Sequence, residues 1–281
     1  MHVHALMEGD AVNKSTEQTQ FAPCYERSLM KYELFSIGRL TIHGYGVMIG
    51  LGFICAVALG MFRAKRNGLS TDDVAGIAIW AVVAGFIGAK LLFVLVEFKA
   101  FLAAPLSVLG STGFVAYGGI LAGAAAAWLY SKKHRQNFLG WFDLLAPSLA
   151  LAQGFGRLGC FMAGCCYGAV TNSVLGIVFP EGGMAPAGVR LWPTQLFSAG
   201  GDFVIAAILL ATYHKLPHKG DGGALYLLLY AVGRFIVEFF RSDERGAVGV
   251  LSTSQFISIF IFAAAVGLLL YNRRKKPKTK E

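Results

Sequence analysis

The chain has 281 residues, of which 56% are apolar and 15% charged, and its mean hydropathy is +0.58. Soluble domains carry about 25% charged residues, so this composition excludes a soluble globular protein. The net charge of +9 does not indicate a nucleic-acid partner, because six of the last nine residues are basic. Such a tail is typical of the cytoplasmic side of a membrane protein, where it contacts anionic lipid.

In chain order, residues 1–39 predict a polar tail or a short surface helix, and residues 1–20 lack the apolar core of a secretory signal peptide. A bilayer core about 30 Å thick requires about 20 apolar residues per helix. Seven such runs follow, at 40–62, 74–96, 114–130, 142–164, 193–214, 223–240 and 252–272. The sequence therefore predicts an all-α, polytopic integral membrane protein with about seven transmembrane helices in one domain over 40–272.

The connections between these runs predict the orientation, because cytoplasmic loops carry an excess of Lys and Arg. One set of connections holds 14 of these residues: 63–73, 131–141, 215–222 and the basic tail 273–281. The opposite set holds 8: the N-terminal tail, 97–113, 165–192 and 241–251. We therefore expect the N-terminus outside and the C-terminus in the cytoplasm. The stretch 165–192, rich in Gly and Pro, is the one long connection and predicts an extracytoplasmic arm or loop.

Three basic residues and one glutamate lie inside the predicted spans: Lys90, Arg157, Arg234 and Glu238. Each would cost roughly 2.5–3.5 kcal/mol at the bilayer centre, so they must face one another or a wet cavity. The predicted topology places all four in the outer half of the membrane, at the level of further polar groups. These are His43, Tyr45, Tyr117, Thr194, Gln195, Ser254 and Gln255.

Arginines at this depth suit a phosphate, since a guanidinium offers a bidentate fork and stays charged when desolvated. A phospholipid headgroup is the natural anion there. The structural alternative is that Glu238 pairs with Arg234 or Arg241 only to hold helices together, because Arg234 and Glu238 are i,i+4 neighbours. One carboxylate cannot also neutralise Arg157 and Lys90, so we favour a lipid-phosphate site.

Cys160, Cys165 and Cys166 lie near the outer end of the fourth predicted span. They could form a redox pair or a soft-metal site, but no histidine is nearby in the sequence and adjacent cysteines form a strained bridge at best. We expect them to act as small buried apolar residues, with neither metal nor cofactor. His43 is either a proton acceptor or a partner in a helix-interface hydrogen bond, and Tyr117 is expected to donate a hydrogen bond.

Five segments, in this order, resemble the prolipoprotein diacylglyceryl transferases, bacterial membrane enzymes that lipidate lipoprotein precursors. They are 35–46, 117–119, 156–168, 193–197 and 233–241, the last being the most specific. The resemblance implies a multi-pass protein of the bacterial inner or plasma membrane. It also implies that the lipobox cysteine in the signal peptide of a prolipoprotein attacks the glycerol carbon of phosphatidylglycerol, forming a thioether and releasing glycerol 1-phosphate.

The same resemblance assigns the residues of the site. Arg157 and Arg234 match essential arginines that would stabilise the leaving phosphate, and with Tyr117 and His43 they make the predicted catalytic set. The predicted substrate-binding set is Tyr45, Lys90, Gly118, Gly119, Gly159, Gln195, Glu238 and Arg241.

The chain departs from the family pattern at several positions. Tyr117 stands where the family usually has His, and Cys160, Ala163 and Cys165 replace two Asn and a Glu of the signature. Two further functions therefore stay open: a phospholipid-binding or transport protein without this chemistry, and a membrane thiol oxidoreductase that uses the three cysteines.

Overall fold

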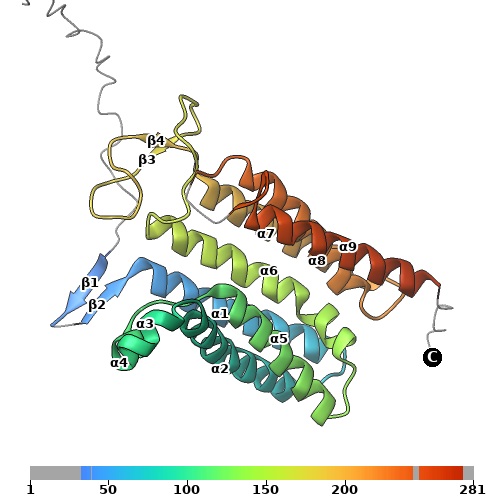
Figure 1. Ribbon diagram of the computed structural model, residues 1–281. Coiled ribbons are helices and arrows are strands. Elements are labelled where there is room, and N and C mark those ends of the chain that lie inside the picture. Colours follow the sequence, from blue (N-terminus) through green and yellow to red (C-terminus); the bar gives the residue numbers. More distant parts are fainter. Residues whose placement is uncertain (1–32, 39, 243–246, 275–281) are drawn as a thin grey trace, which may run out of the picture.

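Seven long helices dominate the computed structural model, which describes residues 33–38, 40–242 and 247–274 (Figure 1). Each overlaps one predicted apolar run. The helices are α1 (Gly44–Arg66), α2 (Thr71–Val96), α5 (Ala116–Lys133), α6 (Phe138–Met162), α7 (Thr194–Thr212), α8 (Asp221–Glu238) and α9 (Thr253–Arg273). The fold is thus mainly helical, as the hydropathy pattern predicts.

Five of these helices are long and apolar enough to cross a membrane: α1, α2, α6, α9, and α7 together with the 3-10 turn η1 (Tyr213–Lys215) that follows it. The other two have 18 residues each. Helix α5 ends on two lysines, and α8 contains Asp221, Arg234 and Glu238. Large apolar side chains on α2 are open to the surroundings, with Phe86 65% and Leu95 66% exposed, which is the surface expected of a lipid-facing helix.

The segment before the first helix differs from the prediction of a polar tail or surface helix. In its described part, β1 (Glu33–Ile37) and β2 (Leu40–His43) form an antiparallel hairpin. Gly38 adopts a φ of +61° in the turn, which a residue without Cβ does at little cost, and the flanking β-branched residues favour strands. The rest of the predicted tail, residues 1–32, lies outside the described residues.

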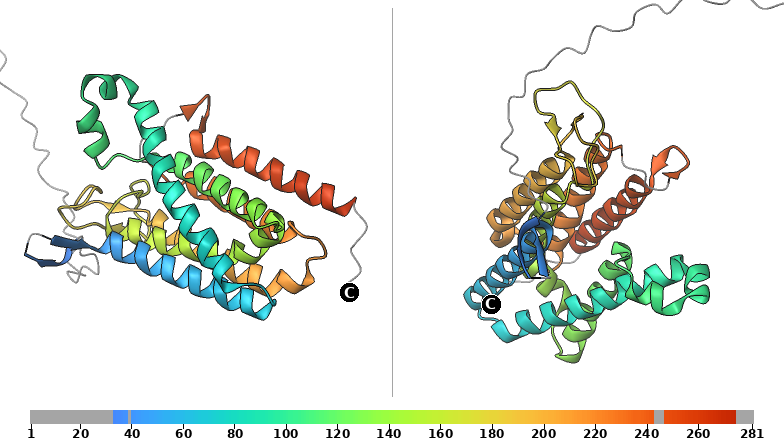
Figure 2. Two further views of the ribbon diagram at one scale, coloured as in Figure 1. Left: turned by 90° about the horizontal axis from the view of Figure 1, so that it is seen from below. Right: turned by 90° about the vertical axis from the view of Figure 1, so that its left-hand side faces the viewer.

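Three connections contain short elements of their own, although the sequence predicted only one long connection. Between α2 and α5 lie two short helices, α3 (Phe98–Ala103) and α4 (Pro105–Gly110), which project from the end of the bundle (Figure 2). The stretch 165–192 carries β3 (Ile177–Val178) and β4 (Arg190–Leu191), and a small hairpin of β5 (Ala247–Val248) and β6 (Leu251–Ser252) precedes α9.

Helix α6 is the centre of the bundle and packs against α1, α7 and α8, while α9 packs on α8 (Figure 1). Small residues on α6 permit these approaches. A Cβ on Gly159 would lie 3.2 Å from the Tyr45 ring of α1, and a Cβ on Gly154 would collide with the Phe203 ring of α7. Glycine at these positions therefore brings the neighbouring helices close to the C-terminal half of α6.

Helices α2 and α5 form a separate pair that contacts the bundle through α1 and, less extensively, through α6. Their seam is built from glycine. A Cβ on Gly118 would collide with the carbonyl of Gly88, and one on Gly119 would lie 3.0 Å from the carbonyl oxygen of Gly85. The two backbones therefore touch directly, as in small-residue packing of membrane helices.

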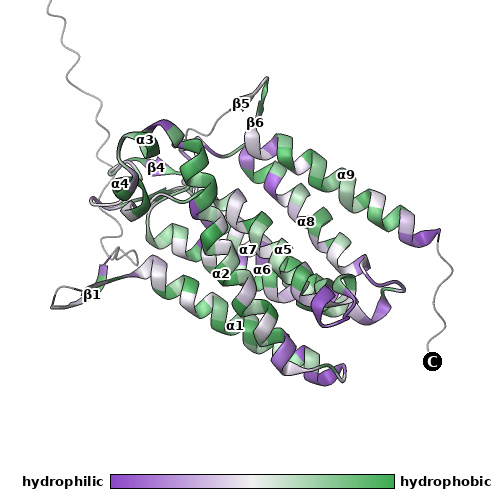
Figure 3. Cartoon of the chain, turned by 60° about the horizontal axis from the view of Figure 1, so that its bottom comes forward, coloured by the Kyte–Doolittle hydropathy of each residue, from purple (hydrophilic) through white to green (hydrophobic). Residues whose placement is uncertain are grey.

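The end of the bundle opposite the short helices is held by Asp143 of α6. The backbone N–H groups of Gly220 and Gly223, at the start of α8, donate to its carboxylate at 2.6 and 2.7 Å. Asn272 of α9 donates to Asp221 at 2.8 Å, so α6, α8 and α9 are joined at this end. Hydrophilic residues gather at helix ends and loops, and the helices between them are hydrophobic (Figure 3).

Replacing Asp143 by Ala is expected to lower the free energy of unfolding by about 2–3 kcal/mol, because two backbone donors lose their acceptor. Equilibrium unfolding in detergent measures this change. The matched control is Glu181→Ala, which removes a carboxylate from an exposed loop and should stay within about 0.5 kcal/mol of the parent protein. Equal stabilities of the two variants would contradict the role of Asp143 at the helix ends.

Gly118→Ala is expected to destabilise the protein by about 1–3 kcal/mol, because a methyl group forces the α2 and α5 backbones apart. Gly267→Ala, on α9 where a Cβ would meet nothing within 4 Å, is the control and should be neutral or stabilising by up to about 1 kcal/mol. Thermal unfolding midpoints of both variants test the packing. Equal stability of Gly118→Ala and Gly267→Ala would contradict the direct contact between the α2 and α5 backbones.

Candidate active site

Two arginines from neighbouring helices meet near one end of the bundle. Arg157 lies in the last turns of α6 and Arg234 in the last turns of α8, and the two guanidinium groups interact electrostatically. The Arg234 guanidinium donates to the Ser254 hydroxyl of α9 at 2.7 Å and forms an ion pair with Glu238 at 2.6 Å. Three helices therefore position this pair of like charges.

Glu238 is shared between two cations. Besides Arg234, it faces Arg241, whose Nε lies 3.9 Å from the same carboxylate oxygen. The side chains of Arg234, Glu238 and Arg241 are only 10%, 7% and 3% exposed. The structural alternative, in which Glu238 pairs with Arg234 or Arg241, is therefore present in the structure, and Glu238 pairs with both arginines.

Arg157 differs from the other two arginines, because it forms no ion pair with any residue that the structure describes. It interacts electrostatically with Asp202 of α7 and with Tyr230 of α8. The three arginines thus face one shared carboxylate and one more distant one. The site carries an excess of positive charge in a region of low dielectric constant, where like charges repel strongly.

The chain after α6 joins the helix ends around this charge. The Gly168 and Ala169 N–H groups donate to the carbonyls of Trp192 and Phe240, at 2.9 and 2.8 Å. The Thr194 hydroxyl and the Gln195 amide, at the start of α7, donate to the carbonyls of Cys166 and Cys165 at 2.8 and 2.7 Å. The C-terminal ends of α6 and α8 and the start of α7 are therefore fixed relative to one another.

Two further predicted residues lie at this site. Gln195 is 1% exposed, and its Oε1 atom has no hydrogen-bond partner among the residues described here. Tyr45 of α1 packs on Gly159 and interacts electrostatically with Arg157 and with the three cysteine thiols. Tyr45, Gly159 and Gln195 are thus brought together with the arginines, as their predicted common depth requires.

Lys90 makes its contacts elsewhere. Its ammonium donates to the carbonyls of Ser111 and Gly113 at 2.7 and 3.3 Å and lies 5.0 Å from the centre of the Phe114 ring. These contacts tie α2 to the segment that contains α3 and α4. The helix pair α2 and α5 packs mainly on α1, so a shared depth in the membrane does not by itself place Lys90 beside the arginines.

The remaining predicted residues also lie on other elements. Tyr117 begins α5 and is 41% exposed, whereas Gly118 is buried, and Gly118 and Gly119 form the seam with α2. His43 is exposed at the end of β2, opposite Glu33 in the hairpin. His43 thus belongs to the β1–β2 hairpin, and Tyr117, Gly118 and Gly119 belong to the α2–α5 pair.

Sequence reasoning left out Tyr230, which interacts electrostatically with both Arg157 and Arg234. It lies four residues before Arg234, and i,i+4 neighbours share a helix face, so the spacing alone could have identified it. Ser254 was predicted at the same depth as the arginines but not as part of the site, because a serine near a helix start is ordinarily a cap.

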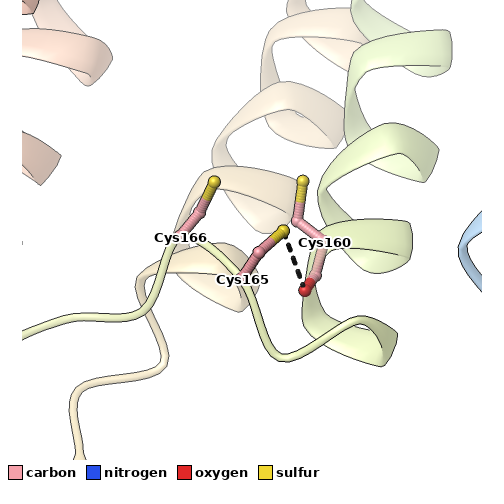
Figure 4. Close-up of side chains that lie close together, drawn as sticks. All are labelled: Cys160, Cys165 and Cys166. Carbon is pink, nitrogen blue, oxygen red and sulfur yellow. Dashed lines mark hydrogen bonds between the residues drawn. The ribbon is translucent and has the colours of Figure 1, made fainter. Parts of the chain in front are cut away.

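The three cysteines converge next to the arginines (Figure 4). Their Sγ atoms all lie within 4.8 Å of one another, and the Cys165 thiol donates to the Cys160 carbonyl at 3.6 Å. The thiols of Cys160 and Cys165 and the adjacent Arg241 guanidinium lower the pKa of Cys166. The three thiols therefore interact with one another and with a cation, and the expectation that they act as small buried apolar residues stays a prediction.

Comparison with known proteins identifies the family. Residues 32–271 match the family model described as prolipoprotein diacylglyceryl transferase. Phosphatidylglycerol–prolipoprotein diacylglyceryl transferase 2 of Clostridium perfringens is 47% identical over 254 residues, covering 90% of this chain and 98% of that protein. The enzyme of Clostridium tetani is 45% identical, covering 86% and 97%, and one from Dehalococcoides mccartyi is 33% identical, covering 86% and 94%. The chain therefore belongs to the prolipoprotein diacylglyceryl transferase family.

Proposed function

We propose that the protein transfers a diacylglyceryl group from phosphatidylglycerol to the lipobox cysteine of a prolipoprotein signal peptide. The observation that carries this proposal is the meeting of Arg157 and Arg234, of which Arg157 forms no ion pair within the described part of the chain. Two desolvated like charges that are close enough to interact repel each other unless an anion offsets them. The names of the relatives supply that anion, the phosphate of phosphatidylglycerol.

The reaction is a displacement at the glycerol carbon that bears the phosphate. The substrate thiol loses its proton, and its sulfur forms a C–S bond with that carbon. The C–O bond to the phosphate breaks, and its electron pair leaves on the phosphate oxygen of glycerol 1-phosphate. Arg157 and Arg234 stabilise the charge that develops on this oxygen, in the manner of an oxyanion hole, and bind the phosphate in the ground state through bidentate hydrogen bonds.

The neighbouring polar groups act as positioning residues for Arg234. The Glu238 carboxylate and the Ser254 hydroxyl each contact its guanidinium, which fixes the direction of its remaining N–H groups. The amide of Gln195 has an acceptor oxygen to spare, which suits a hydroxyl of the lipid glycerol. Tyr45 covers the α1 side of the site, next to Arg157.

The proposed orientation places this site in the outer half of the bacterial plasma or inner membrane, with seven spans, the N-terminus outside and the C-terminal tail in the cytoplasm. Two features support it. Basic residues occupy the last turns of α1, α5 and α9, at the end of the bundle away from Arg157 and Arg234. The seven long helices coincide with the seven apolar runs.

The function is tested by incubating the purified protein with labelled phosphatidylglycerol and a lipobox peptide, and measuring the gain in peptide mass by one diacylglyceryl group. Arg157→Lys is expected to lose at least about 100-fold in rate, because a point charge replaces the bidentate donor. Arg274→Lys, an exposed residue after α9, is the control and should retain the parent rate.

Each result decides between stated functions. Binding of phosphatidylglycerol without any gain in peptide mass would support the alternative of a lipid-binding or transport protein. Full activity of Arg157→Lys would contradict the role given to the guanidinium pair. A change in the oxidation state of added dithiols, without lipid transfer, would indicate the thiol oxidoreductase.

The orientation is tested with reporter fusions in a bacterial host. A fusion after Tyr271 should be active only for a reporter that functions in the cytoplasm, and a fusion within 105–110 only for one that functions outside. The reverse pattern would place the arginine site in the inner half of the membrane and overturn the proposed topology.

A further inference from the structure

We propose that Cys160, Cys165 and Cys166 form a three-thiolate site for one thiophilic divalent cation such as Zn²⁺, with the fourth coordination position left for the substrate thiol. The metal site stands on the cysteine geometry alone, whereas the role of the fourth position rests on the proposed function.

The distances between the sulfur atoms fit a metal centre. A tetrahedral zinc site has Zn–S bonds of about 2.3 Å, which places its sulfurs about 3.8 Å apart. The three Sγ atoms lie within 4.8 Å of one another, so contraction by about 1 Å or less is sufficient, and small side-chain rotations supply it. Figure 4 shows the side chains of Cys160 and Cys166 extending in the same direction, with the Cys165 sulfur below their sulfurs and nearer to that of Cys160.

The backbone holds the three cysteines in this arrangement. Cys160 belongs to the last turn of α6, and the chain then folds back through Gly164 and Cys166, with φ values of +64° and +61°. A non-glycine residue adopts such a φ only when its surroundings impose it. Here the hydrogen bonds from Thr194 and Gln195 to the carbonyls of Cys166 and Cys165 hold the backbone in this conformation.

The surrounding charge favours a thiolate site. Three thiolates with one divalent cation carry a net charge of about −1, which a low-dielectric region tolerates only beside positive groups. The Arg157 guanidinium interacts electrostatically with Cys160 and Cys166, and Arg241 also interacts with Cys166. The site is therefore compensated by Arg241 and by Arg157, which is also proposed to bind the lipid phosphate.

The donor set leaves one position open. Among the residues that the structure describes, the group contains three thiols and no histidine or carboxylate. Structural zinc sites have four protein ligands, whereas catalytic ones have three and keep the fourth position for water or substrate. Cys24 lies outside the described residues, so a control variant must remove it.

An open coordination position supplies a step that the proposed reaction requires, the deprotonation of the substrate thiol. The substrate thiol must become a thiolate, yet His43 is exposed at the end of β2 and Tyr117 lies on the α2–α5 pair. A metal-bound thiol is deprotonated outright, with its proton released to water. The sulfur then donates an electron pair to the glycerol carbon as the C–O bond breaks, so no oxidant or reductant is required.

Metal binding is tested on the reduced, full-length protein in detergent, stripped with a chelator and titrated with Zn²⁺ against a chromophoric competitor. We expect one Zn²⁺ per chain. Replacing residues that only support the ligands of a metal lowers the metal affinity by about 10–100-fold. Replacing a ligand itself, as in Cys160→Ser or Cys166→Ser, should therefore lower the affinity for Zn²⁺ by about 100-fold or more. The double variant Cys24→Ser, Cys55→Ser removes the two cysteines outside the cluster and should bind as tightly as the parent.

A second measurement does not depend on variants that fold poorly. Co²⁺ bound to the parent protein should show sulfur-to-cobalt charge-transfer absorption and the intense visible bands of tetrahedral coordination. Octahedral Co²⁺ without these bands, or an affinity equal to that of Cys160→Ser, would overturn the site. Loss of two thiols to a disulfide under mild oxidation in the presence of Zn²⁺ would also overturn it, in favour of a redox pair.

The transfer assay separates the metal site from the proposed function. Transfer that requires Zn²⁺ supports the open position. Zn²⁺ binding with equal transfer rates for the stripped and loaded protein would overturn the role of that position and leave the function intact. Zn²⁺ binding with no transfer in either form would overturn the function and, with it, the role of the position, but leave the metal site intact.

Discussion

The arrangement of this protein depends on holding two guanidinium groups together inside a membrane-embedded bundle against their mutual repulsion. Backbone contacts hold the helices together, and Glu238 supplies a counter-charge for Arg234. Glycines on α6 let α1 and α7 approach closely, and hydrogen bonds from the chain after α6 join the ends of α7 and α8. Because these contacts do not involve the guanidinium of Arg157, its hydrogen-bonding groups stay available for an anion.

The helices could be predicted from the sequence because a bilayer imposes a length of about 20 apolar residues on each span. The elements that were mispredicted lie where this constraint does not act. Residues 33–43 alternate too briefly to reveal a hairpin, and α3 and α4 are single short helices of 6 residues each. Their formation depends on local turns and on contacts such as those of Lys90, which pattern analysis does not detect.

The sequence predicts how far along each span a residue lies, but not which helices are neighbours. Counting along each span placed Lys90 at the level of Arg157 and Arg234, and the structure places the two arginines together but connects Lys90 to Ser111. Which helices are neighbours depends on glycine seams between residues far apart in the chain. The pairing of Arg234 with Glu238 was accessible because it lies within one helix, whereas the cysteine cluster requires a fold-back at two positive φ angles.

Anion binding and thiol chemistry place opposite demands on the same cations. Thiolates at Cys160 and Cys166 draw on the positive charge of Arg157 and Arg241, and so compete with a lipid phosphate for it. A divalent cation bound to the three sulfurs removes most of this competition, because it offsets two of the three negative charges. The sulfurs then keep a charge of about −1 and still share Arg157 with the phosphate, and such coupling between two sites is reciprocal. In the proposed reaction, Arg157 therefore connects the site that prepares the nucleophile with the site that binds the leaving group.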